Sequence, residues 1–242
     1  MNTRAKNEQT VTIQLYRDMN PVMNDAYDRL ISRIPLLKKI KGYSLFTITG
    51  CEPGVGVTAI AINLAVSLAA SGWCTLLVDA DIRKSPARKR LSVTAAFGLS
   101  DYLRGEVPLS LAVAATNIDN LYYLAGGAPV EDPVVLLNSR NLQSLVELAE
   151  AHYDYVIFDS PALNTTIDAA LLAEKTSGAI LVARYRQTKR RKIEAAVREL
   201  QQTGGTLIGI VLNRVEGRDY RRYIENYDYF VTGAGATKRK KK

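Results

Sequence analysis

Short apolar runs alternate with amphipathic segments along most of the chain. The apolar runs predict strands at residues 44–49, 73–78, 121–124, 153–158, 179–182 and 207–212. Apolar side chains three or four positions apart predict helices at residues 25–41, 58–70, 97–105, 133–138, 140–152, 167–175 and 189–202. Such alternation predicts an α/β fold, with a doubly wound and mostly parallel sheet and helices on both faces.

The same pattern suggests three regions. Residues 1–24 are mostly polar and are expected to form a flexible arm, residues 25–215 a single domain, and residues 216–242 a tail. Inside the first helix, Pro35 is expected to end or kink its first part.

The glycine-rich segment from Thr47 to Thr58 lies between a predicted strand and a predicted helix. In that setting the pattern G-x-x-x-x-G-K-[ST] binds nucleotide phosphates, because backbone N–H groups and the helix N-terminus converge on the phosphate oxygens. Gly56 occupies the second glycine position, Thr58 supplies the hydroxyl, and Gly50 lies one residue before the first glycine position, which is Cys51. Val57 occupies the lysine position, so the sequence predicts a phosphate loop without its cation.

Nucleotide binding is predicted for this loop and for one distant asparagine. Asn213 follows the last predicted strand, where an asparagine that binds adenine could lie. The predicted binding residues are Gly54, Val55, Gly56, Val57, Thr58, Ala59 and Asn213.

Three aspartates follow the ends of predicted strands. Asp79 and Asp81 come after one apolar run, and Asp159 ends another. Ligands bind at the carboxyl ends of strands in open α/β sheets, and carboxylates there hold Mg²⁺ directly or through water. For Asp79 and Asp81 a solvated turn is the alternative.

Composition and charge restrict the class of protein. A chain of 242 residues with 47% apolar residues can bury a full core, and it contains no apolar run long enough to span a membrane. Cys51 and Cys74 have no disulfide or metal-site spacing, which favours a reducing compartment. His152 has no catalytic partner at a recognisable spacing.

The net charge is +8, and residues 238–242 are all basic. That basic end is read as a solvated tail or as a contact with anionic membrane, and nucleic acid is the least favoured partner.

Taken together, three motifs resemble those of the bacterial tyrosine kinases (BY-kinases) of capsule and exopolysaccharide synthesis. They are Cys51–Thr58, Val78–Arg83 and Val156–Pro161, which correspond to the Walker A, Walker A′ and Walker B motifs of that family. The resemblance extends from about residue 25 to residue 213. Each motif alone also occurs in the wider superfamily of partition ATPases.

The resemblance implies a cytoplasmic P-loop autokinase of the partition-ATPase-like branch that uses ATP, and yields ADP, with Mg²⁺. Asp79, Asp81 and Asp159 would be catalytic, and Thr58, Asp79 and Asp159 would bind the metal. Its partners would be a membrane-spanning polysaccharide co-polymerase that acts as adaptor and further copies of the chain in a ring. The location would be peripheral, at the inner face of the cell membrane.

The family also implies that tyrosines near the C-terminus accept phosphate. Four tyrosines lie within ten residues of polar sequence here, which favours an exposed cluster over a packed aromatic edge. The predicted phosphoacceptors are Tyr220, Tyr223, Tyr227 and Tyr229.

Several positions depart from the family pattern. Val57 replaces the loop lysine, Glu52 stands where partition ATPases carry their signature lysine, and the ring-forming arginines are missing near Asp28 and Ile31. Loss of one charge-assisted hydrogen bond costs about 1.5–3 kcal/mol, or about 10- to 150-fold in nucleotide affinity.

A basic residue from elsewhere could substitute, with Arg83, Arg184 and Lys189 as candidates. Three hypotheses therefore stay open: an impaired or rescued tyrosine kinase, a pseudokinase that acts as a regulatory partner, and a partition-type ATPase.

Overall fold

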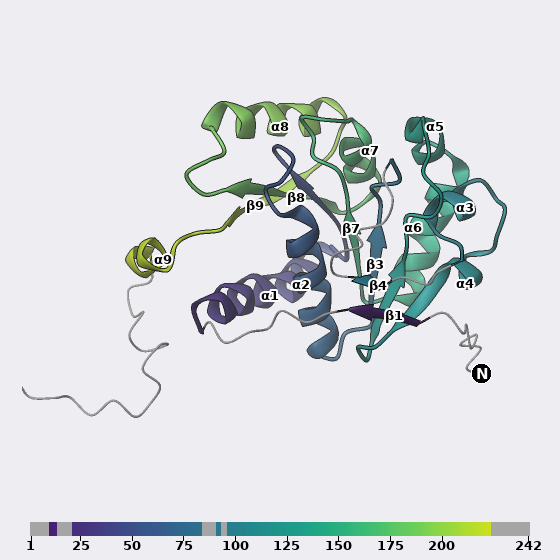
Figure 1. Cartoon of the computed structure of the whole chain (residues 1–242), viewed down its shortest axis with the longest axis horizontal. Helices are drawn as coiled ribbons and strands as arrows, with labels where there is room; N and C mark the ends of the chain where they lie inside the picture. Colours follow the sequence, from purple (N-terminus) through teal and green to yellow (C-terminus); the bar gives the residue numbers. More distant parts are fainter. Residues whose placement is uncertain (1–9, 14–20, 84–90, 93–95, 224–242) are drawn as a thin grey trace, which may run out of the picture.

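The computed structural model describes residues 10–13, 21–83, 91–92 and 96–223. Within them the strands form one nine-stranded sheet in the order β4-β1-β5-β6-β3-β7-β2-β8-β9 (Figure 1). The strands are β1 (Thr10–Ile13), β2 (Leu45–Gly50), β3 (Thr75–Asp79), β4 (Leu91–Ser92), β5 (Val113–Thr116), β6 (Leu121–Leu124), β7 (Tyr155–Asp159), β8 (Gly178–Arg184) and β9 (Leu207–Asn213). Every neighbouring pair from β6 to β9 is parallel, whereas β5 is antiparallel to β6 and β4 is antiparallel to β1. The predicted mostly parallel sheet is confirmed.

Helices cover both faces of this sheet. They are α1 (Pro21–Lys41), α2 (Val57–Ala70), α3 (Leu99–Leu103), α4 (Leu109–Ala112), α5 (Pro133–Leu137), α6 (Arg140–His152), α7 (Asp168–Lys175), α8 (Arg190–Gln202) and α9 (Gly217–Tyr223). Buried side chains of α1 and α2 pack on one face, and those of α3, α6, α7 and α8 pack on the other. In Figure 1, β8 and β9 run between α8 and α1, as the doubly wound architecture requires. None of the helices in the described residues is long and apolar enough to cross a membrane.

The three central strands, β2, β3 and β7, are buried at every position. Strands covered on both faces read as continuous apolar runs, which is why the sequence revealed them clearly. Within β2, Phe46 and Ile48 belong to the core under α1 and α2, whereas Leu45 belongs to the core on the opposite face. The parallel arrangement brings the carboxyl ends of these three strands to one edge of the sheet.

The structure differs from the sequence prediction at the start of the chain. Thr10–Ile13 was expected in a flexible arm but forms β1, which pairs with β5 and β4. Helix α1 begins at Pro21 and runs through Pro35 without ending, so the expected end there is wrong, and a kink at Pro35 stays a prediction. The division at residue 24 stays a prediction, although the sheet includes residues before it.

Strand β9 lies at the end of the sheet in the described part of the chain. Ile208 and Val211 contact the core, but Ile210 and Leu212 are 48% and 49% exposed. Terminal strand β9 therefore exposes apolar side chains on the face of the sheet that it shares with Leu181 and Ala183 of β8.

Candidate functional site

The glycine-rich loop joins β2 to α2 and is anchored at its base. Cys51 N–H donates to the carbonyl of Val182 in β8 at 3.1 Å, and Leu163 N–H donates to the carbonyl of Gly50 at 3.0 Å. Gly54 and Gly56 adopt φ values of +79° and +99°, which other residues rarely adopt. Because no side chain caps α2 at Gly56, the amides of its first turn are left to a ligand or to solvent. The predicted phosphate loop is thus built as a loop followed by an uncapped helix.

Val57 is the first residue of α2, and Ala59 lies in the same turn. The Val57 side chain is partly buried and packs against the core under α1 and α2. A Cβ atom added to Gly50 would lie 2.9 Å from Val57 Cγ2 and 2.7 Å from Val55 Cγ2, so both valines lean over the base of the loop. An apolar branch therefore occupies the position from which a lysine would reach the phosphates.

Asp79 and Asp159 lie side by side at the carboxyl ends of β3 and β7, where they form a register pair. They are only 6% and 7% exposed. The backbone links the two strand ends, because Ala80 N–H donates to the carbonyl of Asp159 at 2.8 Å. The hydroxyl of Thr58 lies close enough to the side chain of Asp159 to favour its ionised form, which connects the loop to the carboxylates.

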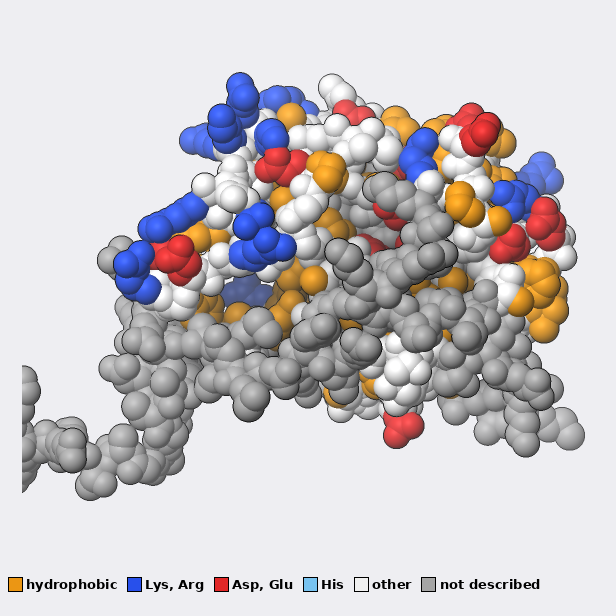
Figure 2. Space-filling view, viewed as in Figure 1, with side chains coloured by type: hydrophobic (Ala, Val, Ile, Leu, Met, Phe, Trp, Pro, Cys, Tyr) orange, Lys and Arg blue, Asp and Glu red, His pale blue; other side chains and the backbone are white. Residues whose placement is uncertain are grey.

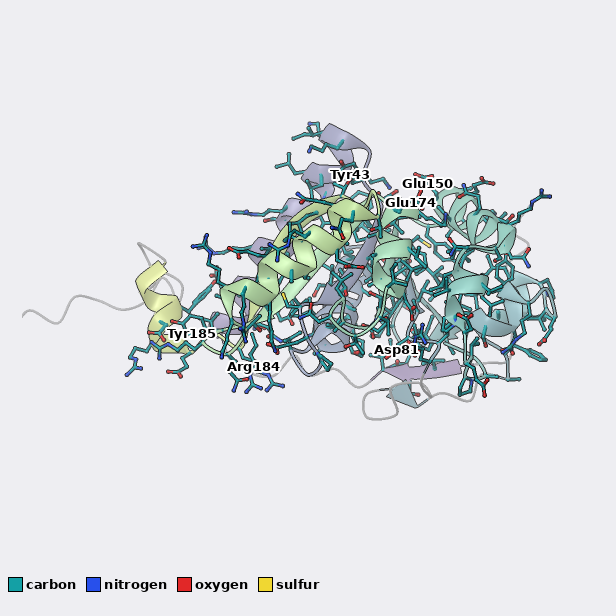
Figure 3. The ribbon with its side chains drawn as sticks, turned by 90° about the horizontal axis from the view of Figure 1, so that it is seen from above. Tyr43, Asp81, Glu150, Glu174, Arg184 and Tyr185 are labelled. Atoms are coloured by element: carbon teal, nitrogen blue, oxygen red, sulfur yellow. The ribbon has the colours of Figure 1, made fainter. Side chains whose placement is uncertain are left out.

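Asp81 lies just outside this buried pair. Its N–H donates to Asp79 Oδ1 at 3.2 Å, so the turn after β3 holds the Asp79 carboxylate. In Figure 3, Asp81 and Arg184 lie on the opposite side of the molecule from Tyr43, which precedes β2. The solvated-turn alternative fails for Asp79, which is buried, while Asp81 is half-buried.

Burial controls the protonation of the two carboxylates. Removal from solvent, followed by the charge of Asp81, raises the pKa of Asp79 to about 7. Removal from solvent, followed by the charge of Asp79, raises the pKa of Asp159 to about 8. Two buried carboxylates without a cation resist ionisation, and a bound divalent cation would reverse that preference.

Thr58, Asp79 and Asp159 suit Mg²⁺ as a set of hard oxygen donors. Magnesium in phosphate sites is held by one or two carboxylates together with water and the phosphates of the nucleotide. The donor set therefore fits Mg²⁺ bound together with a nucleotide.

The sequence analysis missed Tyr123, which lies beneath the carboxylates. This β6 side chain is 1% exposed, and its hydroxyl donates to Asp79 Oδ2 at 3.5 Å. The apolar run around it predicted the strand, but pairing across the sheet, which brings β6 next to β3, was needed to place the hydroxyl.

Basic side chains around the loop differ from the three candidates expected to replace the lysine. Arg83 donates two hydrogen bonds, at 2.7 and 2.9 Å, to Asp168 of α7, a residue that is 1% exposed. Lys189 is exposed and precedes α8. Arg184 is half-buried at the end of β8. Lys192, which the sequence analysis did not consider, forms an ion pair with Glu52 of the loop.

Asn213 contacts the loop directly. Its Nδ2 donates to the carbonyl of Val55 at 2.8 Å, and its Oδ1 accepts from the N–H of Arg214 at 2.8 Å. A mostly apolar pocket of about 370 Å³ lies beside it, lined by residues of α1, α2, the end of β9 and α9. Asn213 positions the loop in this structure, and adenine binding by it stays a prediction.

The tyrosine-rich tail begins in α9. Tyr220 is half-buried rather than exposed as expected, because its hydroxyl donates to Asp25 Oδ2 of α1 at 2.6 Å. Burial, followed by this hydrogen bond, raises the pKa of Tyr220 to about 12. Tyr223 is the last residue of α9 and its side chain lies outside the description, as do Tyr227, Tyr229 and the basic residues 238–242.

Comparison with known proteins agrees with this geometry. The family model described as AAA domain matches residues 45–188, which include all three motifs. The tyrosine-protein kinase CpsD of Streptococcus pneumoniae is 35% identical over 197 residues, which cover 79% of this chain and 84% of that protein. CpsD of Streptococcus agalactiae is 33% identical over 176 residues, which cover 72% and 76%. A Klebsiella pneumoniae protein, named for a tyrosine-protein kinase in the cps region, is 31% identical over 180 residues, which cover 74% of this chain and 25% of that one.

Solved structures show the same fold. The chimeric protein CapA2B2 superposes with a TM-score of 0.74 at 28% identity and covers 84% of this chain and 92% of its own. The kinase domain of the Escherichia coli tyrosine kinase ETK gives 0.74 at 25% identity, with 85% and 91% covered. MinD of Pyrococcus horikoshii gives 0.60 at 23% identity, with 76% and 78% covered, a likeness of fold alone. With its three motifs assembled on a P-loop NTPase fold, this chain belongs to the family of bacterial tyrosine kinases.

Proposed function

We propose that this protein is a nucleotide-binding, BY-kinase-like regulator of capsule or exopolysaccharide synthesis, with phosphoryl transfer weakened at Val57. One observation carries the proposal: Thr58, Asp79 and Asp159 meet beside a glycine loop that has kept its shape. The relatives named as tyrosine-protein kinases support the reaction class.

Each group would act on a defined part of the bound nucleotide. Backbone amides of Gly54, Val55, Gly56 and the first turn of α2 would bind phosphate oxygens. Thr58, Asp79 and Asp159 would hold Mg²⁺, and Asp81 would orient Asp79 through the turn that both share. Mg·ATP supplies the phosphoryl group together with divalent charge that stabilises its transfer. A tyrosine hydroxyl would be the acceptor.

The remaining parts of the proposal concern partners and location. Tyr220, Tyr223, Tyr227 and Tyr229 would accept phosphate, Tyr220 only after its hydroxyl leaves Asp25. A membrane-spanning polysaccharide co-polymerase would serve as adaptor, copies of the chain would assemble as a ring, and the basic end would contact anionic membrane. The protein would then work in the cytoplasm at the inner face of the membrane.

A pseudokinase is the second candidate, and two loop residues favour it. Val57 removes one phosphate contact, and Glu52 places a negative charge near the place where phosphates would bind. In that case the protein would keep the adaptor contact and serve as a substrate or scaffold of another kinase. A partition-type ATPase has only the fold in its favour.

Intact-mass spectrometry after incubation with Mg·ATP tests the proposal, with Asp159→Asn as the matched variant. Slow addition of phosphate to tyrosine in the parent, absent in Asp159→Asn and accelerated by Val57→Lys, would support a weakened kinase. If the parent binds Mg·ADP in a calorimetric titration but neither it nor Val57→Lys acquires phosphate, the pseudokinase candidate replaces the kinase. Repeating the reaction with the cytoplasmic segment of the co-polymerase covers the case in which the adaptor is required.

A further inference from the structure

An acidic side chain in the phosphate loop has a basic partner on another element. Glu52 lies two residues after Gly50, and its carboxylate forms an ion pair with Lys192 of α8. This pairing with Lys192 holds the pKa of Glu52 below its ordinary value. In Figure 1 the loop between β2 and α2 lies directly below α8, and Figure 2 shows Lys and Arg side chains gathered where α8 begins.

Charge at the loop has to be rebalanced when a nucleotide binds. Phosphate groups would enter a loop that carries the Glu52 carboxylate and, at Val57, no cation. Two negative groups a few ångströms apart repel each other unless a cation lies between or beside them. Lys192 is a basic side chain that the structure places in contact with the loop segment.

We infer that Lys192 binds the phosphates of the bound nucleotide and supplies the positive charge that Val57 lacks. Glu52 holds the Lys192 ammonium beside the loop before the nucleotide arrives. The inference rests on the proposed function, since it concerns the nucleotide of that same site. It assigns phosphate recognition to α8, an element outside the glycine loop.

The surroundings of Lys192 suit this role. Its side chain is 39% exposed, so the ammonium can turn from one anion to another. Its backbone is fixed because Ile193, Ala196 and Leu200 of the same helix pack in the core. The loop is tied to β8, the strand that precedes α8, through the hydrogen bond from Cys51 to Val182. A lysine also has the flexible stem that such a movement requires.

Two other candidate cations already have carboxylate partners of their own. Arg83 donates two hydrogen bonds to the carboxylate of Asp168, which is buried and would lose its partner if Arg83 moved. Arg190 lies on the same helix as Lys192 but is 93% exposed and pairs with Glu194. This makes Arg190 a matched control, because its removal deletes the same charge from the same helix.

Calorimetric titration of the full chain with Mg·ADP tests the inference. We expect Lys192→Met to weaken binding about tenfold, Arg190→Met to leave it unchanged and Lys192→Arg to restore part of it. Glu52→Gln should bind a few times more tightly than the parent, because it removes a negative charge and releases Lys192. Thermal unfolding followed by circular dichroism shows that each variant is folded.

The double variant Glu52→Gln/Lys192→Met separates phosphate contact from simple neutralisation of Glu52. If Lys192 binds phosphate, the double variant stays well below Glu52→Gln in affinity. Parental affinity in Lys192→Met, or equal affinity in Glu52→Gln and the double variant, would overturn the inference and leave the proposed function standing. A folded parent that does not bind Mg·ADP at all would instead refute nucleotide binding itself, and the role of Lys192 with it.

Discussion

The two sides of this site have diverged to different degrees from the pattern expected of a phosphoryl-transfer protein. On the carboxylate side, Asp79 and Asp159 are buried, paired in register and linked to Thr58. On the loop side the backbone keeps its shape, but two positions lack the expected positive charge. Val57 is apolar where the loop lysine is expected, and Glu52 is acidic where partition ATPases carry a lysine. The carboxylates and the loop can therefore be altered one at a time, and the effect of each change on nucleotide binding can be measured.

The largest effect is expected on the carboxylate side. Asp159→Asn removes one of the two buried carboxylates proposed to hold Mg²⁺ and should reduce the Mg²⁺-dependent gain in nucleotide affinity about 100-fold, or about 2.8 kcal/mol. Titration with ADP in the presence and absence of Mg²⁺ measures this gain. Asp119→Asn, on an exposed turn, is the control. Equal Mg²⁺ dependence in the parent and in Asp159→Asn would show that the buried pair does not bind the metal.

The next test addresses the loop. Val57→Lys should increase affinity for Mg·ADP about tenfold, or about 1.4 kcal/mol, because it returns a cation to a loop that has kept its backbone. Val57→Met is the control, since it offers a long unbranched stem without charge. If the lysine variant binds no better than the methionine variant, the valine is not what limits phosphate binding, and the loop is not the weaker side of the site.

Protonation of the carboxylates gives a third test, without nucleotide or Mg²⁺. The folded pKa values of Asp79 and Asp159 are about 7 and about 8, against an ordinary value of 3.8 in the unfolded chain. The folded protein binds more protons in that interval, so this contribution to stability is present at low pH and is lost as the pH rises through 7 and 8. Between about pH 7 and about pH 8, urea unfolding should show the parent losing about 1 kcal/mol more than Asp159→Asn. Parallel curves would contradict the raised pKa of Asp159.

The smallest effect concerns the contact between the tail and the domain. Tyr220→Phe removes the hydrogen bond to Asp25 and should lower stability by only about 0.5 kcal/mol, because the contact is half-exposed and Asp25 keeps its ion pair with Arg29. Hydrogen exchange of α9 should accelerate while exchange of β2 and β3 stays unchanged. Unaltered exchange in α9 would show that the hydroxyl does not hold this helix.

The sequence predicted those features that depend on neighbours along the chain. Continuous apolar runs identified β2, β3 and β7. Two of these runs end in an aspartate and the third ends in the glycine loop, so all three ends could be placed at one edge of a parallel sheet. Amphipathic spacing predicted α6 and α8 to within a residue or two. Parallel topology then determined that Asp79 and Asp159 meet.

What the sequence did not predict depends on contacts between distant segments. Lys192 and Glu52 are 140 residues apart, and Tyr220 and Asp25 are 195 apart. Thr10–Ile13 alternates threonine with valine and isoleucine, but four residues are too few to predict a strand within a polar segment, and the stretch forms β1 by pairing with β5. Propensity is a weak guide where pairing decides the structure.

The position of β9 at the end of the sheet, together with its exposed apolar side chains, has a practical consequence for the protein at high concentration. A terminal strand with exposed Ile210 and Leu212 is a template on which a second molecule can add a strand, which is the first step of aggregation. Long-range repulsion from the net charge of +8 opposes that encounter. Added salt screens this repulsion but leaves the apolar edge unchanged. We therefore expect colloidal stability to fall as ionic strength rises, so that dilute, low-salt solutions keep the protein dispersed longest.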